Sequence, residues 1–146
     1  MFLGEHDRSV DDKGRMFLPA KFREELGKSI IITQGMDKCL YIFPESTWTE
    51  FARGLAQRND SNVDVRKLQR MFIGRAVSCD VDKQGRIVIP PKVRATVGIS
   101  NNVTIVGMMN KLEVWDAQTY ANEDLDTEEV QDLMAKLDFS GSSYGI

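Results

Sequence analysis

Two aspartate and arginine pairs share the same spacing along the chain. Asp11 precedes Arg15 and Asp82 precedes Arg86, and a glycine stands directly before each arginine. Across a tight turn such a carboxylate accepts hydrogen bonds from backbone N–H groups or pairs with the guanidinium. Either contact holds the guanidinium donors in one orientation, in which they can bind phosphate groups or the base edges of a nucleic acid.

The two pairs belong to an internal repeat in which equivalent residues lie 71 positions apart. Residues 10–19 return as residues 81–90, each with a polar turn, an apolar strand-type run and a proline that ends it. Nearly the whole chain is therefore two copies of one unit. The similarity continues into two Lys-x-Arg pairs, which are Lys21, Arg23, Lys92 and Arg94.

A single Asp-x-x-x-Arg pair around a turn is typical of a surface ion pair worth less than about 1 kcal/mol. A role in folding alone requires only the glycine and the apolar run to recur. Here the exposed cations recur as well, which favours contact with an external polyanion. The predicted DNA-binding residues are Asp11, Lys13, Arg15, Lys21, Arg23, Asp82, Lys83, Arg86, Lys92 and Arg94.

The elements around the first turn follow from the pattern of apolar residues. Residues 5–10 and 15–18 flank the turn, and the simplest prediction is a hairpin. After Pro19, apolar spacing predicts a short helix over Ala20–Leu26. The second copy predicts the same plan, with a hairpin about its own turn and a helix from Pro90 to Val97.

The rest of each copy predicts strands and longer helices. In the first copy, residues 30–33 and 40–43 form a second hairpin before an amphipathic helix over Ser46–Gln57, whose Trp48 and Phe51 are core candidates. The polar link at 58–62 then leads into a helix. The remaining predictions are strands at 103–106 and 112–115, one exposed helix over Tyr120–Leu137, and a loose end at Ser140–Gly145.

The predicted fold is mainly β with short helices, in the α+β class. We divide the chain into a first repeat, a link with a helix, a second repeat, and an acidic helix with a tail, which are residues 1–57, 58–70, 71–122 and 123–146.

Composition excludes several classes of function. The apolar runs are far shorter than the roughly 20 residues of a membrane span, and the first residues lack the pattern of a signal peptide, so a cytoplasmic location is expected. Cys39 and Cys79 form no metal-ligand pattern and are predicted to be reduced core residues. His6 is the only histidine, so no catalytic set, metal site or cofactor is expected.

The net charge of −3 is unevenly distributed. Residues 1–122 hold 18 Lys and Arg against 15 Asp and Glu, whereas residues 123–146 hold one Lys and seven acidic residues. The repeats are therefore weakly basic, and the acidity of the chain lies in its end. This distribution is compatible with a nucleic-acid partner for the repeats.

Several motifs together resemble the bacterial MraZ family, which is related in fold to the AbrB and MazE regulators. They are Met1-Phe2-x-Gly4, Asp11-x-x-Gly14-Arg15 with Pro19 and Arg23, the Leu-Tyr-Ile-Phe-Pro strand end at 40–44, and Asp82-x-x-Gly85-Arg86-Ile87-x-Ile89-Pro90. The resemblance covers about residues 1 to 122 and includes both copies in order.

The resemblance implies a tandem AbrB-like swapped-hairpin fold, a double-split β-barrel with short helices, and a ring-shaped homo-oligomer. It also implies a nucleoid-associated transcriptional regulator that binds short direct repeats upstream of the division and cell-wall gene cluster. The family's Asp-x-x-x-Arg motifs correspond to Asp11 with Arg15 and Asp82 with Arg86. A ring also fits the modest charge of the repeats, because linked subunits raise avidity about 10² to 10⁴-fold on repeated sites.

An alternative is an antitoxin-like interaction module that uses the acidic helix from Glu123 to Asp138. A solvated helix, or one that docks on its own body or on a neighbour, explains the same pattern. Deletion of residues 123–146 distinguishes the two functions, because DNA binding should survive it in a DNA-binding regulator, whereas capture of a partner should be lost in an antitoxin-like module. An enzyme is a distant third reading, because the sequence offers no base, nucleophile or metal set.

Overall fold

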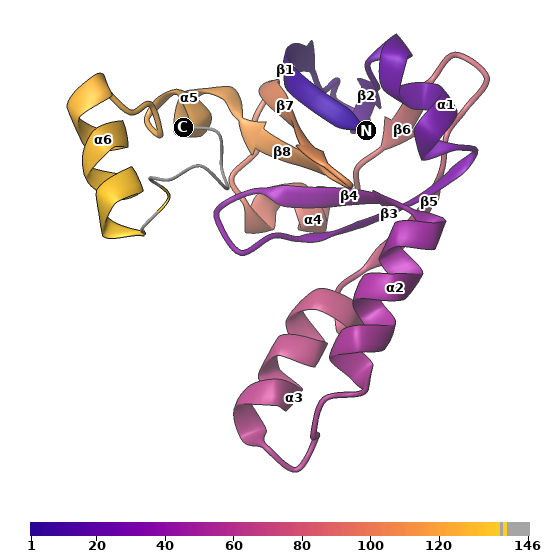
Figure 1. Ribbon diagram of the computed structural model, residues 1–146. Helices are drawn as coiled ribbons and strands as arrows, with labels where there is room; N and C mark the ends of the chain where they lie inside the picture. Colours follow the sequence, from indigo (N-terminus) through magenta and orange to yellow (C-terminus); the bar gives the residue numbers. More distant parts are fainter. Residues whose placement is uncertain (138, 140–146) are drawn as a thin grey trace.

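In the computed structural model, which describes residues 1–137 and 139, the two copies of the repeat exchange strands (Figure 1). β1 (Phe2–Ser9) of the first copy pairs antiparallel with β7 (Asn102–Met109) of the second copy. Reciprocally, β5 (Val77–Asp80) of the second copy pairs with β3 (Ser29–Gln34) of the first. Neither copy completes its sheet alone. The prediction of a mainly β protein with short helices and a duplicated unit is confirmed.

The second hairpin predicted in each copy is also confirmed. β3 is followed by β4 (Leu40–Pro44), and β7 is followed by β8 (Leu112–Asp116), each as an antiparallel pair. β4 and β8 pair with each other, which gives the strand order β1-β7-β8-β4-β3-β5. The edge strands β1 and β5 do not pair, so the described strands form an open sheet rather than a closed barrel.

The hairpin predicted around each Asp-x-x-x-Arg turn is wrong. The turn itself forms, but the strands on its two sides enter different sheets. β2 (Arg15–Phe17) pairs with β6 (Arg86–Val88) as a separate two-stranded ribbon. The reason is that the strand ends find partners in the other copy: the Val10 N–H, for example, donates to the Asn101 carbonyl at 2.7 Å.

The register of the strands places an approximate two-fold axis through the molecule. Met16 lies opposite Ile87 in the middle of the β2–β6 ribbon, and Tyr41 lies opposite Glu113 in the middle of the β4–β8 pair. Both pairs join equivalent positions of the two copies. The two Asp-x-x-x-Arg turns are therefore related by this axis and lie at the same end of the body.

The core is shared between the copies. Apolar side chains on the inner face of the ribbon meet those of the open sheet, and burial of such side chains is the main stabilising contribution to folding. The largest fully buried side chains come from both repeats and include Phe2, Met16, Leu18, Ile30, Ile32, Ile87, Ile89 and Ile105.

Short helices follow both ribbon strands, as predicted. In the first copy a 3₁₀ turn (Ala20–Phe22) continues into α1 (Arg23–Leu26), and in the second copy the counterpart is α4 (Pro91–Thr96). Pro90 and Pro91 are compatible with this start, because proline is well suited to the first positions of a helix.

The predicted longer helices form an arm that projects from the body (Figure 1). The arm consists of α2 (Glu45–Ala56) and α3 (Val63–Gln69), followed by a π-helical turn over Arg70–Gly74. Trp48 and Phe51, predicted as core, are half-buried at its base. Neither α2 nor α3 has a fully buried side chain.

The single helix predicted over Tyr120–Leu137 is wrong. The structure has α5 (Ala117–Ala121) and a separate α6 (Thr127–Lys136). The break occurs because Asp126 caps a new helix: its carboxylate accepts the N–H of Glu129 at 2.8 Å. The end predicted to be loose, Ser140–Gly145, lies outside the described residues.

Both cysteines are free thiols. Cys39 is fully buried, and burial raises its pKa to about 12. Cys79 is half-buried at the edge of the core. Burial raises the pKa of Cys79 as well, so neither thiol is activated as a thiolate.

We predict that Gly14→Ala and Gly85→Ala each lower the free energy of unfolding by about 1–3 kcal/mol. Both glycines have φ of +83°, and a Cβ would meet the Ile89 carbonyl oxygen at Gly14 or the Arg23 guanidinium at Gly85. Urea denaturation measures the loss. Gly54→Ala in α2 is the control, because a Cβ there meets no atom within 4 Å. Wild-type stability in the Gly14 and Gly85 variants would contradict this account of the turns.

Candidate nucleic-acid interface

A carboxylate holds the first turn together. Asp11 Oδ1 accepts the backbone N–H of Lys13 at 3.0 Å and that of Arg15 at 2.8 Å. Asp11 Oδ2 accepts the Arg15 Nε at 2.6 Å. The same carboxylate therefore shapes the turn and orients the guanidinium, as the sequence predicts.

The second turn repeats this geometry. Asp82 Oδ1 accepts the N–H of Gln84 at 2.9 Å and that of Arg86 at 2.8 Å, and Oδ2 accepts the Arg86 Nε at 2.8 Å. In both pairs the contact uses Nε. The terminal nitrogens of both guanidinium groups have no hydrogen-bond partner among the described residues. Those nitrogens are the ones that a phosphate or a base edge would need.

The same donors perturb the two carboxyl groups. The backbone N–H of Arg15 and then its side chain hold the pKa of Asp11 below its usual 3.8. Arg86 lowers the pKa of Asp82 in the same way. Both carboxylates are therefore charged at neutral pH, and both turns are fully formed there.

The ribbon presents the two arginines on one face. In a strand, alternate side chains point to opposite faces. Met16 and Ile87 point into the core, so their neighbours on β2 and β6 point outward. The outward face carries Arg15 opposite Val88 and Phe17 opposite Arg86.

Two exposed apolar residues stand beside these arginines. Phe17 is 46% exposed and Val88 is 50% exposed. The Arg86 guanidinium lies 5.8 Å from the centre of the Phe17 ring, which gives a cation–π contact. Sequence reasoning missed both residues. Period-two alternation from Met16 and Ile87 would have identified them as outward-facing.

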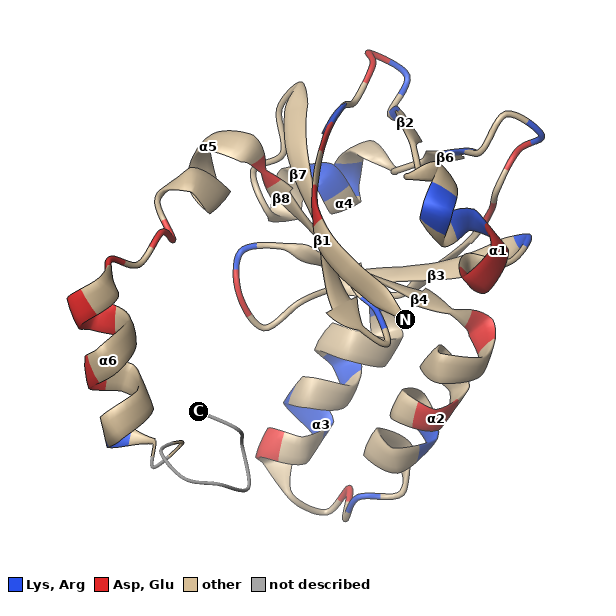
Figure 2. Cartoon of the chain, turned by 45° about the horizontal axis from the view of Figure 1, so that its top comes forward, with Lys and Arg blue, Asp and Glu red and all other residues tan. Residues whose placement is uncertain are grey.

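The predicted lysines lie around the ribbon. Lys13 and Lys83 are exposed in the two turns, and the cartoon in Figure 2 marks charged residues of both signs at the tips of the loops that precede β2 and β6. Lys21 and Lys92 are exposed at the starts of the helices that follow the ribbon strands. Lys21 Nζ lies 5.5 Å from the centre of the Phe22 ring. These four lysines form no salt bridge with another described residue.

Arg23 and Arg94 occupy a different environment from the lysines. Arg23 Nε and Nη2 donate to the Leu18 carbonyl at 3.1 and 3.0 Å, and Arg94 Nε donates to the Ile89 carbonyl at 3.0 Å. Both side chains are half-buried. The structure therefore gives them a packing role at the end of each ribbon strand, and a DNA contact by either residue stays a prediction.

Each of these arginines packs against the turn of the other copy. The guanidinium of Arg23 lies against Gly85, and that of Arg94 lies against Gly14. Backbone bonds cross the same boundary: the Leu18 N–H donates to the Gly85 carbonyl at 2.9 Å, and the Ile89 N–H donates to the Gly14 carbonyl at 2.8 Å. The two turns are therefore held in place reciprocally.

The described residues contain no cluster of three His, Cys, Asp or Glu side chains that could hold a metal ion. No described helix is both long enough and apolar enough to span a membrane.

Comparison with known proteins identifies the family. The profile described as "MraZ protein, putative antitoxin-like" matches residues 1–71 and again residues 71–132. The chain belongs to the MraZ family. The resemblance seen in the Asp-x-x-Gly-Arg motifs is thereby confirmed, and the profile matches once for each copy of the repeat.

Curated MraZ relatives cover most of the chain. The protein named transcriptional regulator MraZ from Lachnoclostridium phytofermentans is 37% identical over 141 residues, 96% of this chain and 99% of its own length. The protein of that name from Cutibacterium acnes is 45% identical over 117 residues, 80% of this chain and 82% of its own. The one from Carboxydothermus hydrogenoformans is 38% identical over 122 residues, 84% and 85% of the two chains.

We predict that Arg23→Ala lowers the free energy of unfolding by about 1–3 kcal/mol, because it removes charged hydrogen bonds to a ribbon carbonyl. Lys21→Ala is the matched control two residues away and should leave stability unchanged. Thermal and urea unfolding of both variants measure the difference. Equal stabilities would show that Arg23 does not support the ribbon.

We also predict that Asp11 and Asp82 titrate below 3.8 in the folded protein. A carboxyl group whose pKa falls on folding stabilises the fold above its unfolded pKa, and this contribution is lost as pH falls through the folded value. Stability should thus decline below about pH 4, and less so in an Asp11→Asn, Asp82→Asn double variant. Carboxyl ¹³C NMR titration in buffer and in urea provides the test. Identical midpoints in the two conditions would refute it.

Proposed function

We propose that the protein is a sequence-specific DNA-binding transcriptional regulator that binds its target through the β2–β6 ribbon and the two Asp-x-x-x-Arg turns. The observation that carries this proposal is the pair of aspartate-anchored arginines on one exposed face, Arg15 and Arg86. The terminal guanidinium nitrogens of both make no hydrogen bond to any residue that the structure describes. The names of the MraZ relatives, all called transcriptional regulators, support the regulatory role.

The ribbon suits the major groove of DNA. That groove is about 12 Å wide and admits a two-stranded β-ribbon. A guanidinium with its terminal nitrogens free can donate to the O6 and N7 of a guanine, and apolar side chains contact the methyl group of thymine. In this arrangement Arg15 and Arg86 read base edges, while Phe17 and Val88 contact the groove beside them.

We assign the four lysines, together with Arg23 and Arg94, to the phosphate backbone of the DNA. Lys13 and Lys83 are exposed at the turn tips, and Lys21 and Lys92 are exposed on the helices that follow the ribbon strands. In the proposed complex these lysines contact phosphates on both sides of the groove. Such contacts fix the register of the protein without reading sequence. Arg23 and Arg94 have a supporting part in this contact: they hold the ribbon in place and add positive charge beneath it.

The target is a set of short direct repeats upstream of the division and cell-wall gene cluster, bound by a ring-shaped homo-oligomer. Residues 1–122 carry an excess of only three positive charges, so one subunit binds DNA weakly and salt screens the contact. Subunits linked in a ring place several ribbons on neighbouring repeats and gain avidity. The protein acts in the cytoplasm and is associated with the nucleoid.

We predict that Arg15→Ala and Arg86→Ala each weaken binding to the DNA upstream of the protein's own gene by at least tenfold, while the circular dichroism spectrum and oligomer size are unchanged. One bidentate base contact is worth about 1–3 kcal/mol, and an assembled ring loses one contact per subunit. Arg53→Ala, an exposed arginine of the arm, is the control and should bind as the wild type does.

Titration in gel shift and fluorescence anisotropy at several stated salt concentrations measures the effect. The salt slope should fall in the Lys13→Ala and Lys83→Ala variants with little change in sequence preference. Undiminished affinity of Arg15→Ala and Arg86→Ala for the upstream DNA would remove the proposed role of the turns.

A further inference from the structure

α6 carries an apolar stripe that no other described element covers. Val130, Leu133 and Leu137 are spaced three and four residues apart, as on one face of a helix, and are 43%, 40% and 59% exposed. α6 has no extensive contact with another described element and stands apart from the body (Figure 1). Exposed apolar stripes of this kind mark binding surfaces.

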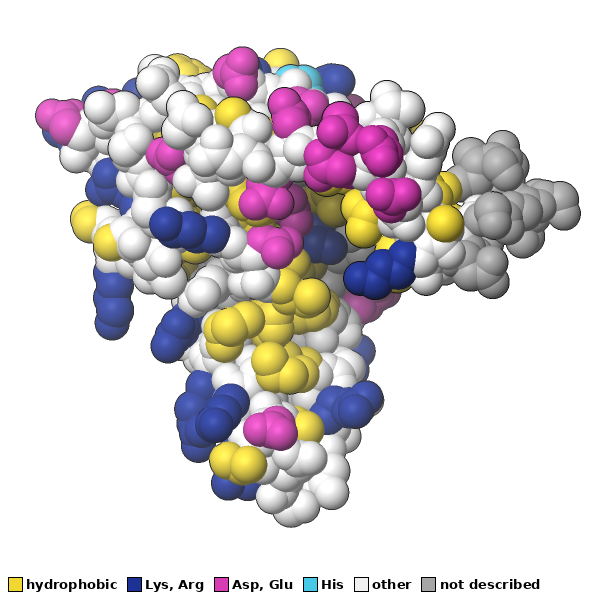
Figure 3. Space-filling model, turned by 90° about the vertical axis from the view of Figure 1, so that its left-hand side faces the viewer, with side chains coloured by type: hydrophobic (Ala, Val, Ile, Leu, Met, Phe, Trp, Pro, Cys, Tyr) yellow, Lys and Arg dark blue, Asp and Glu magenta, His cyan; other side chains and the backbone are white. Residues whose placement is uncertain are grey.

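The arm carries an apolar groove between α2 and α3. The groove has a volume of about 510 Å³ and an apolar lining of Phe51, Leu55, Val65 and Leu68, with Gly54 leaving its floor open. The charged side chains of Glu50 and Arg58 complete the lining. Figure 3 shows hydrophobic side chains exposed in a continuous band from the body down onto the arm. Because neither arm helix has a fully buried side chain, a further layer over this groove would complete the packing of the arm.

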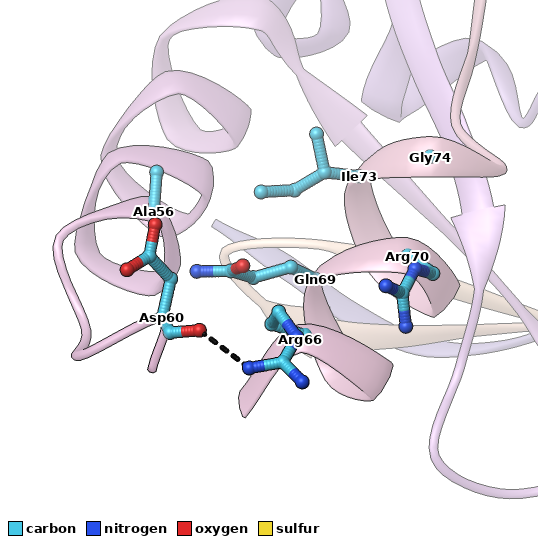
Figure 4. A pocket seen from close by; sticks show the side chains of 7 residues that line it. All are labelled: Ala56, Asp60, Arg66, Gln69, Arg70, Ile73 and Gly74. Atoms are coloured by element: carbon cyan, nitrogen blue, oxygen red, sulfur yellow. Dashed lines mark hydrogen bonds between the residues drawn. The ribbon is translucent and has the colours of Figure 1, made fainter. Parts of the chain in front are cut away.

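The opposite side of the same two helices is less suited to an apolar partner. A pocket of about 400 Å³ lies there, between Ala56 and Ile73 (Figure 4). Its polar side chains hold α3 to the end of α2: Arg66 Nη1 donates to the Asp60 carbonyl at 2.9 Å, and Gln69 Nε2 donates to the Leu55 carbonyl at 3.1 Å. The apolar groove is therefore the surface of the arm that better suits an apolar partner.

The charges of the two surfaces are complementary. The segment 123–136 around α6 carries six acidic residues and one lysine. The arm and its π-helical turn, residues 45–75, carry six basic residues and four acidic ones, of which Arg58 and Glu50 line the groove itself. Basic side chains lie around the lower part of the arm (Figure 3). Such complementarity favours one orientation of the two surfaces and disfavours contact between two α6 helices.

We propose that α6 of one subunit docks its Val130, Leu133 and Leu137 stripe into the α2–α3 groove of a second copy of this chain. Donor helix and acceptor groove lie on different parts of each subunit (Figures 1 and 2). The contact is therefore head to tail, and repetition of it closes a ring or extends a filament. This interface rests on the self-assembly in the proposed function and is independent of the arginine turns.

Substitutions in the full-length chain test each half of the interface. Gly54→Trp fills the groove, and Val130→Glu with Leu133→Glu places two charges on the stripe. Gly54→Ala is the control for the groove. Gln131→Glu with Ala135→Glu adds the same two charges to the opposite face of α6, where both residues are exposed, and is the control for the helix.

We expect the wild type and both controls to form the same multimer in size-exclusion chromatography with light scattering. Gly54→Trp and the stripe variant should each fall to the monomer mass of 16.5 kDa with unchanged circular dichroism. A mixture of the two monomeric variants should form a one-to-one heterodimer, because the intact α6 of the first fits the intact groove of the second. A monomeric wild type, variants that keep the wild-type mass, or a mixture that stays monomeric would each overturn the proposal.

A second measurement does not depend on the assembly state of a variant. A photo-reactive phenylalanine analogue at Leu133 should cross-link to residues 50–68 of another subunit, identified in mixtures of ¹⁴N- and ¹⁵N-labelled chains. Cross-links confined to the same chain, or to other surfaces of a second chain, would overturn the interface. Arg15→Ala should assemble normally, so failure here is distinguishable from failure of the DNA-binding proposal.

Discussion

The structure depends on the reciprocal contact between each Asp-x-x-Gly-Arg turn and the other copy of the repeat. The Gly14 and Gly85 carbonyls accept backbone N–H groups from the partner copy, and the Arg94 and Arg23 guanidinium groups lie against the two glycines. A side chain at either glycine would occupy this space. The position of each turn in the fold therefore depends on contacts from both copies of the repeat.

This constraint links folding to function. A guanidinium on a free loop loses conformational entropy when it binds, and orientation beforehand reduces that cost. Here each aspartate holds the Nε of its arginine, and the ribbon holds the backbone of that arginine. The approximate two-fold symmetry sets the position of one arginine relative to the other. Two arginines with a constant separation suit a ligand with a regular repeat, and the DNA duplex is such a ligand. Assembly through α6 and the arm would extend the same regularity from one subunit to several.

Much of the fold could be predicted from the sequence because local pattern determines it. The 71-residue repeat predicted the duplication, and the β-branched runs predicted the β3–β4 and β7–β8 hairpins. The pairing of β1 and β2 could not be derived from the local pattern, since a turn looks the same whether its strands pair with each other or with another copy. The swapped-hairpin resemblance carried that information. The break before α6 does not follow from apolar spacing, because it depends on the Asp126 carboxylate acting as an N-cap.

The geometry of the two Asp–Arg pairs could be predicted from the sequence, and the surroundings of Arg23 and Arg94 could not. The Asp11–Arg15 and Asp82–Arg86 pairs lie as the spacing required, whereas Arg23 and Arg94 share the charge of the lysines but donate to ribbon carbonyls. Composition cannot separate those two roles.

The most direct test of the central claim is a structure of the assembled protein on a duplex carrying the upstream repeats. The account predicts the β2–β6 ribbon in the major groove, with Arg15 and Arg86 on base edges and both aspartates still bonded to their turns. DNA lying along the α2–α3 arm, with both turns facing solvent, would contradict it.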